Sequence, residues 1–263
     1  MNQIFDGART IICLSFLIYA SWSDYKTREV SNKVWVILGP LALALTAFQF
    51  FVFAPELLLT YVLSFAVTSA LALVIFYAGG FGGADAKALM CIALALPVYP
   101  THLLLQPPGL FSPLFPLTIF TNSVLLGALS VFYALLRNLL WKAKNRRSLF
   151  EGLETESFGR KILALLSGYK IKVTKLEEGH TYPLEDVYEN EEGEKKRKLL
   201  VFPKDEEREE IVARILENVK EEKVDGGVWA TPGLPLLIFV TAGLIIALAY
   251  GDIVWILLGS FLR

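Results

Sequence analysis

The chain has 263 residues, of which 54% are hydrophobic, and a mean hydropathy of +0.51. A soluble domain of this length is less hydrophobic, so the composition excludes one and predicts a membrane protein. The net charge of −1 favours no particular partner, and the sequence carries no nucleic-acid-binding motif. Cys13 and Cys91 lie in apolar segments without CxxC or Cys/His spacing, which predicts buried thiols and neither a metal site nor a cofactor.

Six apolar stretches approach or exceed the length of about 20 residues that crosses a bilayer. No small-residue cleavage site follows the first stretch, so we expect it to span the membrane rather than to be removed as a signal peptide. The six predicted spans are Ile4–Ser23, Val34–Phe53, Leu57–Ala78, Ala84–Tyr99, Leu117–Trp141 and Leu234–Leu262.

The distribution of Lys and Arg predicts the orientation, because loops rich in these residues stay in the cytoplasm. Basic residues follow the first predicted span, begin the fourth and close the fifth, which places them all on one side of the membrane. The loops 53–56 and 97–116 carry no Lys or Arg. We therefore expect a multi-pass protein of the cell membrane with its N-terminus outside.

Most of the 25 basic and 26 acidic residues lie in one polar block, residues 142–229. In it, "YKIKVTKL" alternates like a strand and "KLLVFP" is a second strand candidate, while "DEEREEIVARILENVKEE" places Ile211, Ile215 and Val219 on one helical face. The charged stretch "EDVYENEEGEKKRK" is typical of a solvated turn. We predict an all-α polytopic membrane protein of about six transmembrane helices, with a small cytoplasmic α+β domain inserted before the last helix. The predicted domains are a membrane domain 1–141, the soluble domain 142–229 and the sixth transmembrane helix 230–263.

Two aspartates lie where a predicted span meets the cytoplasm: Asp24 in "YASWSDYKTREVSNKVW" and Asp85 in "GGFGGADAKALM". Each has an ordinary explanation, since Asp85 suits the start of a helix and Asp24 has Lys26 and Arg28 nearby as ion-pair partners. Acids near membrane depth are costly, however, and mark functional sites. Two spans separate the aspartates, so both can end at the same depth and meet. Asp252, inside the last predicted span, has no predicted role.

Two carboxyl groups within hydrogen-bond reach cannot both ionise, so such a pair shares one proton. The ionised group takes a proton from water while the protonated one polarises a carbonyl, which hydrolyses a peptide without a metal or a covalent intermediate. The glycines before Asp85 let the backbone approach an extended peptide closely. Asp24 and Asp85 are therefore the candidate catalytic residues. The candidate substrate-positioning residues are Gly82, Gly83 and Lys87, of which Lys87 also fits an interfacial lysine with its charge in water.

Both aspartate motifs resemble known enzymes. "GGAD" followed by Lys87 resembles the GxGD motif of polytopic aspartyl proteases. "SDYKTREVSN" resembles the first-aspartate region of type IV prepilin peptidases, in which an Ile-Pro-Asn-like triplet follows the aspartate by six residues. Here the triplet is Val30-Ser31-Asn32, without the proline, and Ala84 replaces the second glycine of GxGD. Neither departure changes a carboxylate.

Among these families the chain resembles the archaeal preflagellin peptidases most, in the six-span layout, both motifs and the soluble domain before the last span. The resemblance implies an aspartic endopeptidase that removes a short, positively charged leader (class III signal peptide) from preflagellin or prepilin-like substrates at the cytoplasmic membrane face. Bacterial prepilin peptidases typically add paired CxxC motifs and an N-methyltransferase activity. The chain lacks those pairs, so the implied role is protease only, and it leaves open which aspartate is the base.

Two other functions stay as alternatives. An intramembrane protease of the signal-peptide-peptidase or presenilin kind shares the two aspartates, but usually has more spans and a Tyr-Asp pair, whereas Ser23 precedes Asp24 here. A small proton- or cation-coupled transporter would also use membrane acids and glycine-broken helices. Its acids should lie near mid-membrane, whereas both aspartates lie beside basic residues.

Overall fold

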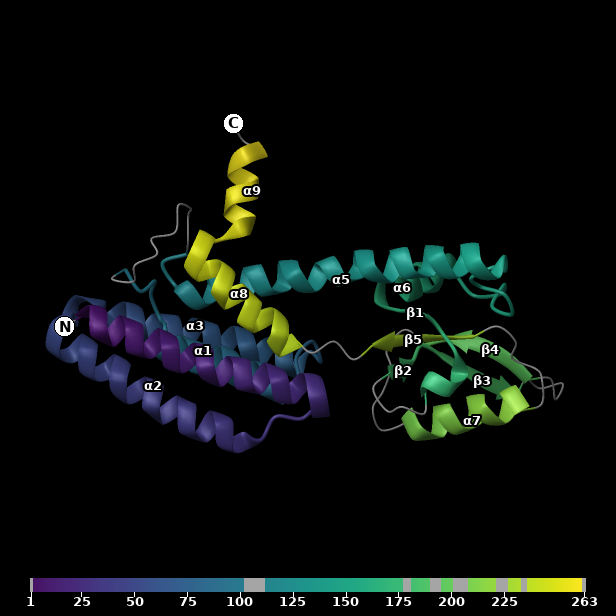
Figure 1. Cartoon of the computed structure of the whole chain (residues 1–263), viewed down its shortest axis with the longest axis horizontal. Coiled ribbons are helices and arrows are strands. Elements are labelled where there is room, and N and C mark those ends of the chain that lie inside the picture. The colour runs from purple at the N-terminus through teal and green to yellow at the C-terminus, as the bar shows by residue number, and fades with distance from the viewer. Residues whose placement is uncertain are drawn as a thin grey trace. The chain divides into compact units, whose positions relative to one another are not determined.

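The computed structural model describes residues 2–101, 112–176, 181–189, 195–200, 208–220, 227–232 and 236–261. It divides into two compact units, one formed by Met1–Gly127 with Pro235–Arg263 and the other by Ala128–Leu234. Figure 1 shows the first as a set of helices and the second as the part that holds the strands. The domain boundaries drawn from the sequence stay a prediction.

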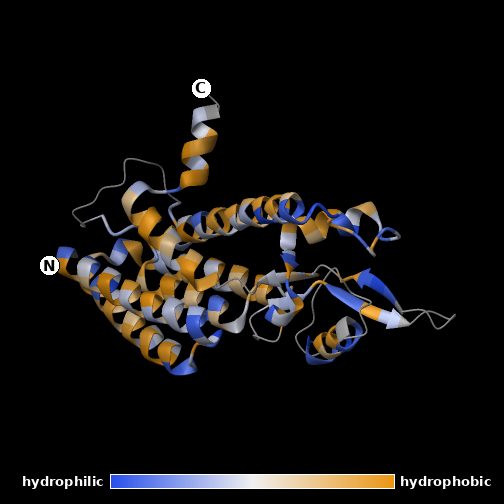
Figure 2. Ribbon diagram, turned by 45° about the vertical axis from the view of Figure 1, so that its right-hand side comes forward, coloured by the Kyte–Doolittle hydropathy of each residue, from blue (hydrophilic) through white to orange (hydrophobic). Residues whose placement is uncertain are grey.

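The first unit is built from apolar helices with few charged residues. They are α1 (Asn2–Thr27), α2 (Asn32–Phe53), the short 3₁₀ helix η1 (Pro55–Leu57), α3 (Leu58–Tyr77), α4 (Gly83–Ala95), the start of α5 (Phe115–Asn145), α8 (Leu236–Tyr250) and α9 (Ile253–Phe261). Figure 2 shows these helices mostly in the colour of hydrophobic residues. Four of the described helices are long and apolar enough to cross a membrane, and α8 with α9 forms a pair bent by 56° that counts as a fifth if it is one span. The protein is thus a multi-pass membrane protein, but the predicted count of six spans is not confirmed.

The structure differs most from the sequence prediction at the fourth predicted span, Ala84–Tyr99. Its helix, α4, has 13 residues and is about 20 Å long at 1.5 Å per residue, against a hydrocarbon core of about 30 Å. The helix stops at Ala95 because Pro97 follows and restricts the residue before it. Side chains of other helices satisfy the carbonyl groups left over at this end: Arg9 and Thr46 donate to Ala95, and Ser64 donates to Pro97.

The last predicted span is broken where Asp252 lies. Its carboxylate accepts hydrogen bonds from the backbone N–H groups of Val254 and Trp255, which start α9, and from the hydroxyl of Thr121 at 2.9 Å. Asn122 bonds both sides of the break, donating to the carbonyl of Gly251 and accepting from the N–H of Ile253. Asp252 therefore caps a helix, which gives this awkward charge a structural role.

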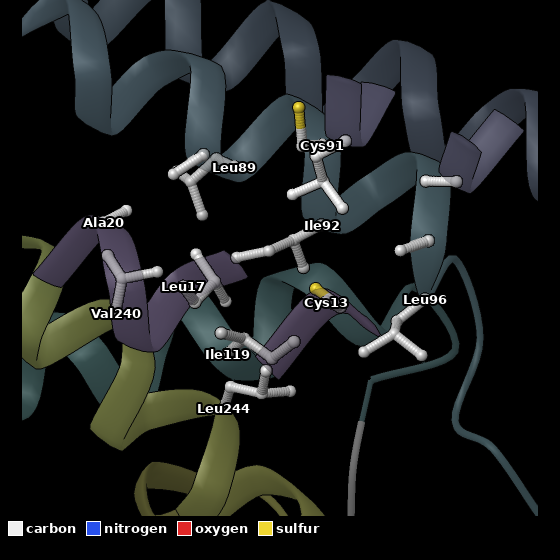
Figure 3. Packing of buried hydrophobic residues seen from close by; sticks show 14 of the residues in the cluster. Cys13, Leu17, Ala20, Leu89, Cys91, Ile92, Leu96, Ile119, Val240 and Leu244 are labelled. Carbon is white, nitrogen blue, oxygen red and sulfur yellow. The ribbon is translucent and has the colours of Figure 1, made fainter. Parts of the chain in front are cut away.

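The core of the first unit is formed mainly by α1, α2, α4, α5 and α8, and Figure 3 shows part of it. Cys13 and Leu17 of α1 meet Ile92 of α4, Ile119 of α5 and Leu244 of α8, all fully buried or nearly so. Both cysteines are buried and free, as predicted. Because α4 lies at the centre of this packing, its position depends on all the surrounding helices.

The second unit combines two small antiparallel sheets with two helices. One sheet has the order β1-β5-β2, from β1 (Tyr169–Ile171), β5 (Val228–Pro232) and β2 (Thr181–Pro183), with Tyr169 and Pro183 both opposite Ala230. The other pairs β3 (Glu185–Glu189) with β4 (Lys195–Leu199). The helices are α6 (Phe158–Ser167) and α7 (Arg208–Lys220), with a 3₁₀ turn η2 (Val173–Leu176). Figure 2 places most of the hydrophilic colour in this unit.

The sequence predicted parts of this unit. The helix is confirmed as α7, with Ile211 and Ile215 buried, while the side chain of Val219 lies outside the described ones. "YKIKVTKL" is a strand only at its start and then turns into η2, and "KLLVFP" joins β4 by its first two residues, while its residues 201–203 lie outside the described ones. The expected solvated turn "EDVYENEEGEKKRK" is wrong for residues 185–189 and 195–198, which form β3 and β4, while its residues 190–194 lie outside the described ones.

Candidate active site

Asp24 lies in the last turns of α1, half-buried. The backbone N–H of Leu237, in the first turn of α8, lies within hydrogen-bonding reach of its carboxylate, and Arg28 acts on it electrostatically. One turn earlier, the hydroxyl of Ser21 donates to the carbonyl of Leu237 at 2.8 Å and bonds Thr241. The start of α8 is thus tied to α1 beside Asp24, and the N–H groups at the start of a helix suit a nearby anion.

Asp85 is the third residue of α4 and is also half-buried. Its Oδ2 accepts a hydrogen bond of 3.0 Å from the N–H of Gly82, while its own N–H donates to the Gly82 carbonyl. Asp85 thus stabilises the start of α4, which is the ordinary structural role of an acid in the first turn of a helix. The bond also fixes one carboxylate oxygen, so the side chain has a defined direction.

The two aspartates interact electrostatically. The buried small side chains Ala20 of α1 and Ala86 of α4 belong to one core cluster and let these helices approach closely. The charge of Asp24 acts on the carboxyl group of Asp85, so the two groups lie close enough to interact electrostatically. Both remain partly open to water. Two acids near one another with water access can perform acid–base chemistry on a bound substrate.

Lys87 links the two aspartate motifs. Its Nζ donates a hydrogen bond of 2.7 Å to Oδ1 of Asn32, the first residue of α2 and the last residue of the Val30-Ser31-Asn32 triplet. The lysine is exposed, so its charge stays in water while its head group holds this amide. The loop between α1 and α2 is therefore attached to the first turn of α4, two residues from Asp85.

The glycines before Asp85 have separable roles. Gly79 takes a positive φ of 78°, and the N–H groups of Gly79 and Gly80 return to the carbonyls of Phe76 and Ile75, which closes the end of α3. A Cβ added at Gly82 would lie 3.1 Å from Oδ2 of Asp85, whereas one at Gly83 would lie an ordinary 3.8 Å from the ring of Phe76. Gly82 alone is thus constrained by the carboxylate.

Comparison with known proteins identifies the family. A model described as the type IV leader peptidase family matches residues 11–132, which include both aspartates, and one described as archaeal peptidase A24 C-terminus type II matches residues 160–253. The chain belongs to the type IV leader peptidase family. It is therefore a peptidase, as its sequence predicted.

Three curated relatives are similar to this chain along most of its length. The preflagellin peptidase of Methanococcus voltae is 28% identical over 246 residues, which cover 90% of this chain and 92% of the relative. That of Methanococcus maripaludis is 21% identical over 241 residues with the same coverage. That of Methanocaldococcus jannaschii is 23% identical over 256 residues, covering 93% of this chain and 95% of the relative.

Sequence reasoning about this leader peptidase missed a second polar cluster, at the other end of α1. Arg9 is 2% exposed and forms an ion pair with Asp6, which also accepts from Gln49 at 3.0 Å. Arg9 donates in addition to the carbonyl of Ala95 at the end of α4. These side chains border a cavity of about 200 Å³ together with Tyr99 and apolar residues. The sequence signal for this cluster was a basic residue three positions after an acidic one in an apolar helix.

This second cluster is distant from the aspartates. Arg9 and Asp24 are fifteen residues apart on one helix, which is about 22 Å at 1.5 Å per residue. Its cavity is therefore separate from the candidate active site. Among the described residues, no three His, Cys, Asp or Glu side chains come together as a metal site would require.

Proposed function

We propose that the protein is an aspartic endopeptidase of the membrane that removes the short, positively charged leader from preflagellin. Membership of the type IV leader peptidase family supports leader cleavage, and the names of three relatives over about nine-tenths of the chain support preflagellin as the substrate. Prepilin-like proteins with the same kind of leader belong to the same proposed substrate class.

The observation that carries the aspartic mechanism is the electrostatic interaction of Asp24, near the end of α1, with Asp85, at the start of α4. Few acids lie in the membrane part of the chain, and the two deeply buried ones, Asp6 and Asp252, have structural partners. Asp6 pairs with Arg9, and Asp252 caps α9. Asp24 and Asp85 interact electrostatically and are both only half-buried, which supports their assignment as the catalytic pair.

In the proposed mechanism one carboxyl group is ionised and the other protonated. The ionised group takes a proton from a water molecule, whose oxygen attacks the scissile carbonyl carbon. The protonated group donates a hydrogen bond to the carbonyl oxygen and stabilises its developing negative charge. The carboxyl group that took the proton from water then donates it to the leaving nitrogen as the carbon–nitrogen bond breaks, which returns that group to its ionised form. The N–H group of Gly82 orients the carboxylate of Asp85, and the N–H group of Leu237 lies within reach of that of Asp24.

The proposed location of cleavage is the cytoplasmic face. Lys26, Lys33 and Lys87 lie near the aspartates in the sequence, and basic residues favour the cytoplasmic side. Glu29, exposed five residues after Asp24, is well placed to attract a positively charged leader. We propose no N-methyltransferase activity, because the chain has two cysteines and no CxxC pair.

The test uses membranes that contain the protein and a preflagellin, with products identified by mass. The expected products are the intact leader and the mature chain that begins at the leader boundary. Cuts inside the hydrophobic helix of the substrate would favour the intramembrane-protease alternative instead. No cleavage, together with proton or cation flux in sealed vesicles, would overturn the proposal in favour of a transporter.

A further inference from the structure

The short helix α6 presents a large apolar surface on one side. Phe158 is 79% exposed, Ile162 37%, Leu163 47% and Leu166 41%, and these four lie along one arc of the helix. The opposite side faces the core, where Ala164 packs in a cluster with Leu153 and Trp229. An amphipathic helix with such large exposed side chains needs a partner for its outer face.

The position of α6 along α5 indicates which partner. The amide of Asn138 in α5 donates to the carbonyl of Gly168, the residue that ends α6, at 2.9 Å, and accepts from the N–H of Lys170. All of these residues belong to the second unit. Next to Asn138, Leu139 and Leu140 of α5 are each 62% exposed. The end of α6 thus lies level with a stretch of α5 that is still apolar on its outside.

This level corresponds to a membrane boundary. The 31 residues of α5 extend about 46 Å, roughly 16 Å more than a hydrocarbon core of about 30 Å, so one end must reach the headgroups. The basic residues Lys142 and Lys144 mark that end. Aromatic residues typical of the boundary gather there too: the ring of Tyr133 is 6.1 Å from that of Tyr169, and Lys170 lies over the ring of Trp141.

We propose that α6 lies in the membrane interface, with Phe158, Ile162, Leu163 and Leu166 inserted among the lipid acyl chains. The partner is an anionic bilayer surface. Exposed basic residues lie at the end of α5 and just after it, close to the proposed membrane boundary, and they attract anionic headgroups. These are Lys142, Lys144, Arg146 and Arg147. The lipid contact docks the second unit against the membrane that α5 crosses. It depends on membrane insertion of α5 and not on the proposed protease mechanism.

The test places a spin label on the full-length protein in vesicles of equal parts phosphatidylcholine and phosphatidylglycerol. Cys13 and Cys91 are replaced by alanine, and the label is attached to Leu163→Cys or, as a control, to Glu210→Cys on the exposed side of α7. At Leu163 we expect collisions with oxygen to exceed those with a water-soluble nickel chelate several-fold, and the reverse at Glu210. The ratio at Leu163 should fall in vesicles of phosphatidylcholine alone.

Two outcomes would overturn the proposal. Free access of the nickel chelate to Leu163 in the mixed vesicles would show a water-facing helix. Exclusion of both reagents, lost when the protein is diluted to one copy per vesicle, would show that a second copy covers α6. As a further check, Ile162→Glu with Leu166→Glu should raise chelate access at Leu163 several-fold, whereas Ser167→Glu, at the edge of the arc, should leave it unchanged.

Discussion

Lys87 in the first turn of α4 donates a 2.7 Å hydrogen bond to Asn32 at the start of α2, and so joins the two aspartate motifs. We expect Lys87→Met and Asn32→Ala each to slow preflagellin cleavage roughly fivefold, the equivalent of about 1 kcal/mol for one hydrogen bond. Because both remove the same bond, the double variant should match the single ones. Cleavage rates of all four proteins test this, and losses that multiply would show that the two residues act independently.

Gly82 and Gly83 form a matched pair. A methyl group at Gly82 meets Oδ2 of Asp85 at 3.1 Å and forces the carboxylate to move, whereas at Gly83 it finds ordinary space. Because small displacements of catalytic groups are costly, we expect Gly82→Ala to lower the cleavage rate by about tenfold or more and Gly83→Ala to change it little. Cleavage rates measured with equal amounts of folded protein test this prediction. Equal losses in the two variants would contradict the role assigned to Gly82.

The buried pair of Asp6 and Arg9 should stabilise the helices rather than serve catalysis. Arg9→Ala leaves Asp6 buried and without its cation and removes one of the two side-chain hydrogen bonds to the carbonyl of Ala95, so we expect a loss of about 3–5 kcal/mol in the free energy of unfolding. Arg9→Met combined with Asp6→Leu removes both charges and should recover much of this loss. Thermal unfolding in detergent measures both variants. A double variant less stable than Arg9→Ala would refute this explanation.

The stability of the second unit should increase at alkaline pH, because the buried Lys170 loses its charge there. Burial lowers the pKa of Lys170 from 10.5 to about 8, against the opposing attraction of Glu185. Between these values the unfolded chain binds the proton and the folded chain does not, so stability rises with pH from about 8 to about 10.5. Below pH 8 the lysine is charged in both states and its unfavourable contribution is constant.

Lys170→Met tests this pH dependence. The variant lacks the titrating group, so the rise in stability over this pH range should disappear, and at neutral pH the variant should be at least as stable as the parent. Hydrogen exchange of the β1 and β5 amides in the full chain at several pH values reports the stability of this unit. An unchanged pH profile would contradict the account.

The sequence was enough to predict Asp24 and Asp85 as the candidate catalytic residues, because carboxylates are rare in apolar segments and these two lie at the ends of predicted spans. The limits of α4 were harder to predict, since its apolar pattern continues to Tyr99 and only packing against the surrounding helices makes a 13-residue helix stable. The break at Asp252 depends on Asn122, a residue 130 positions away, so no local pattern indicates it.

The charged hairpin of β3 and β4 was missed for a related reason. Glu185 and Asp186 belong on the surface by composition, yet both are buried. Burial raises the pKa of Glu185, while Arg197 opposes the shift with two hydrogen bonds, and Arg214 binds both oxygens of Asp186. These partners are distant in the sequence, so the strand is recognisable only in the folded chain.

The measurement that tests the central claim most directly compares preflagellin cleavage by the parent protein with Asp24→Asn, Asp85→Asn and the double variant. Glu56→Gln, which changes an exposed acid in η1, is the matched control. If the aspartates act as one catalytic pair, each single variant loses cleavage as fully as the double variant, while all remain folded and Glu56→Gln cuts at the parent rate. Cleavage at the parent rate by either folded single variant would contradict the account.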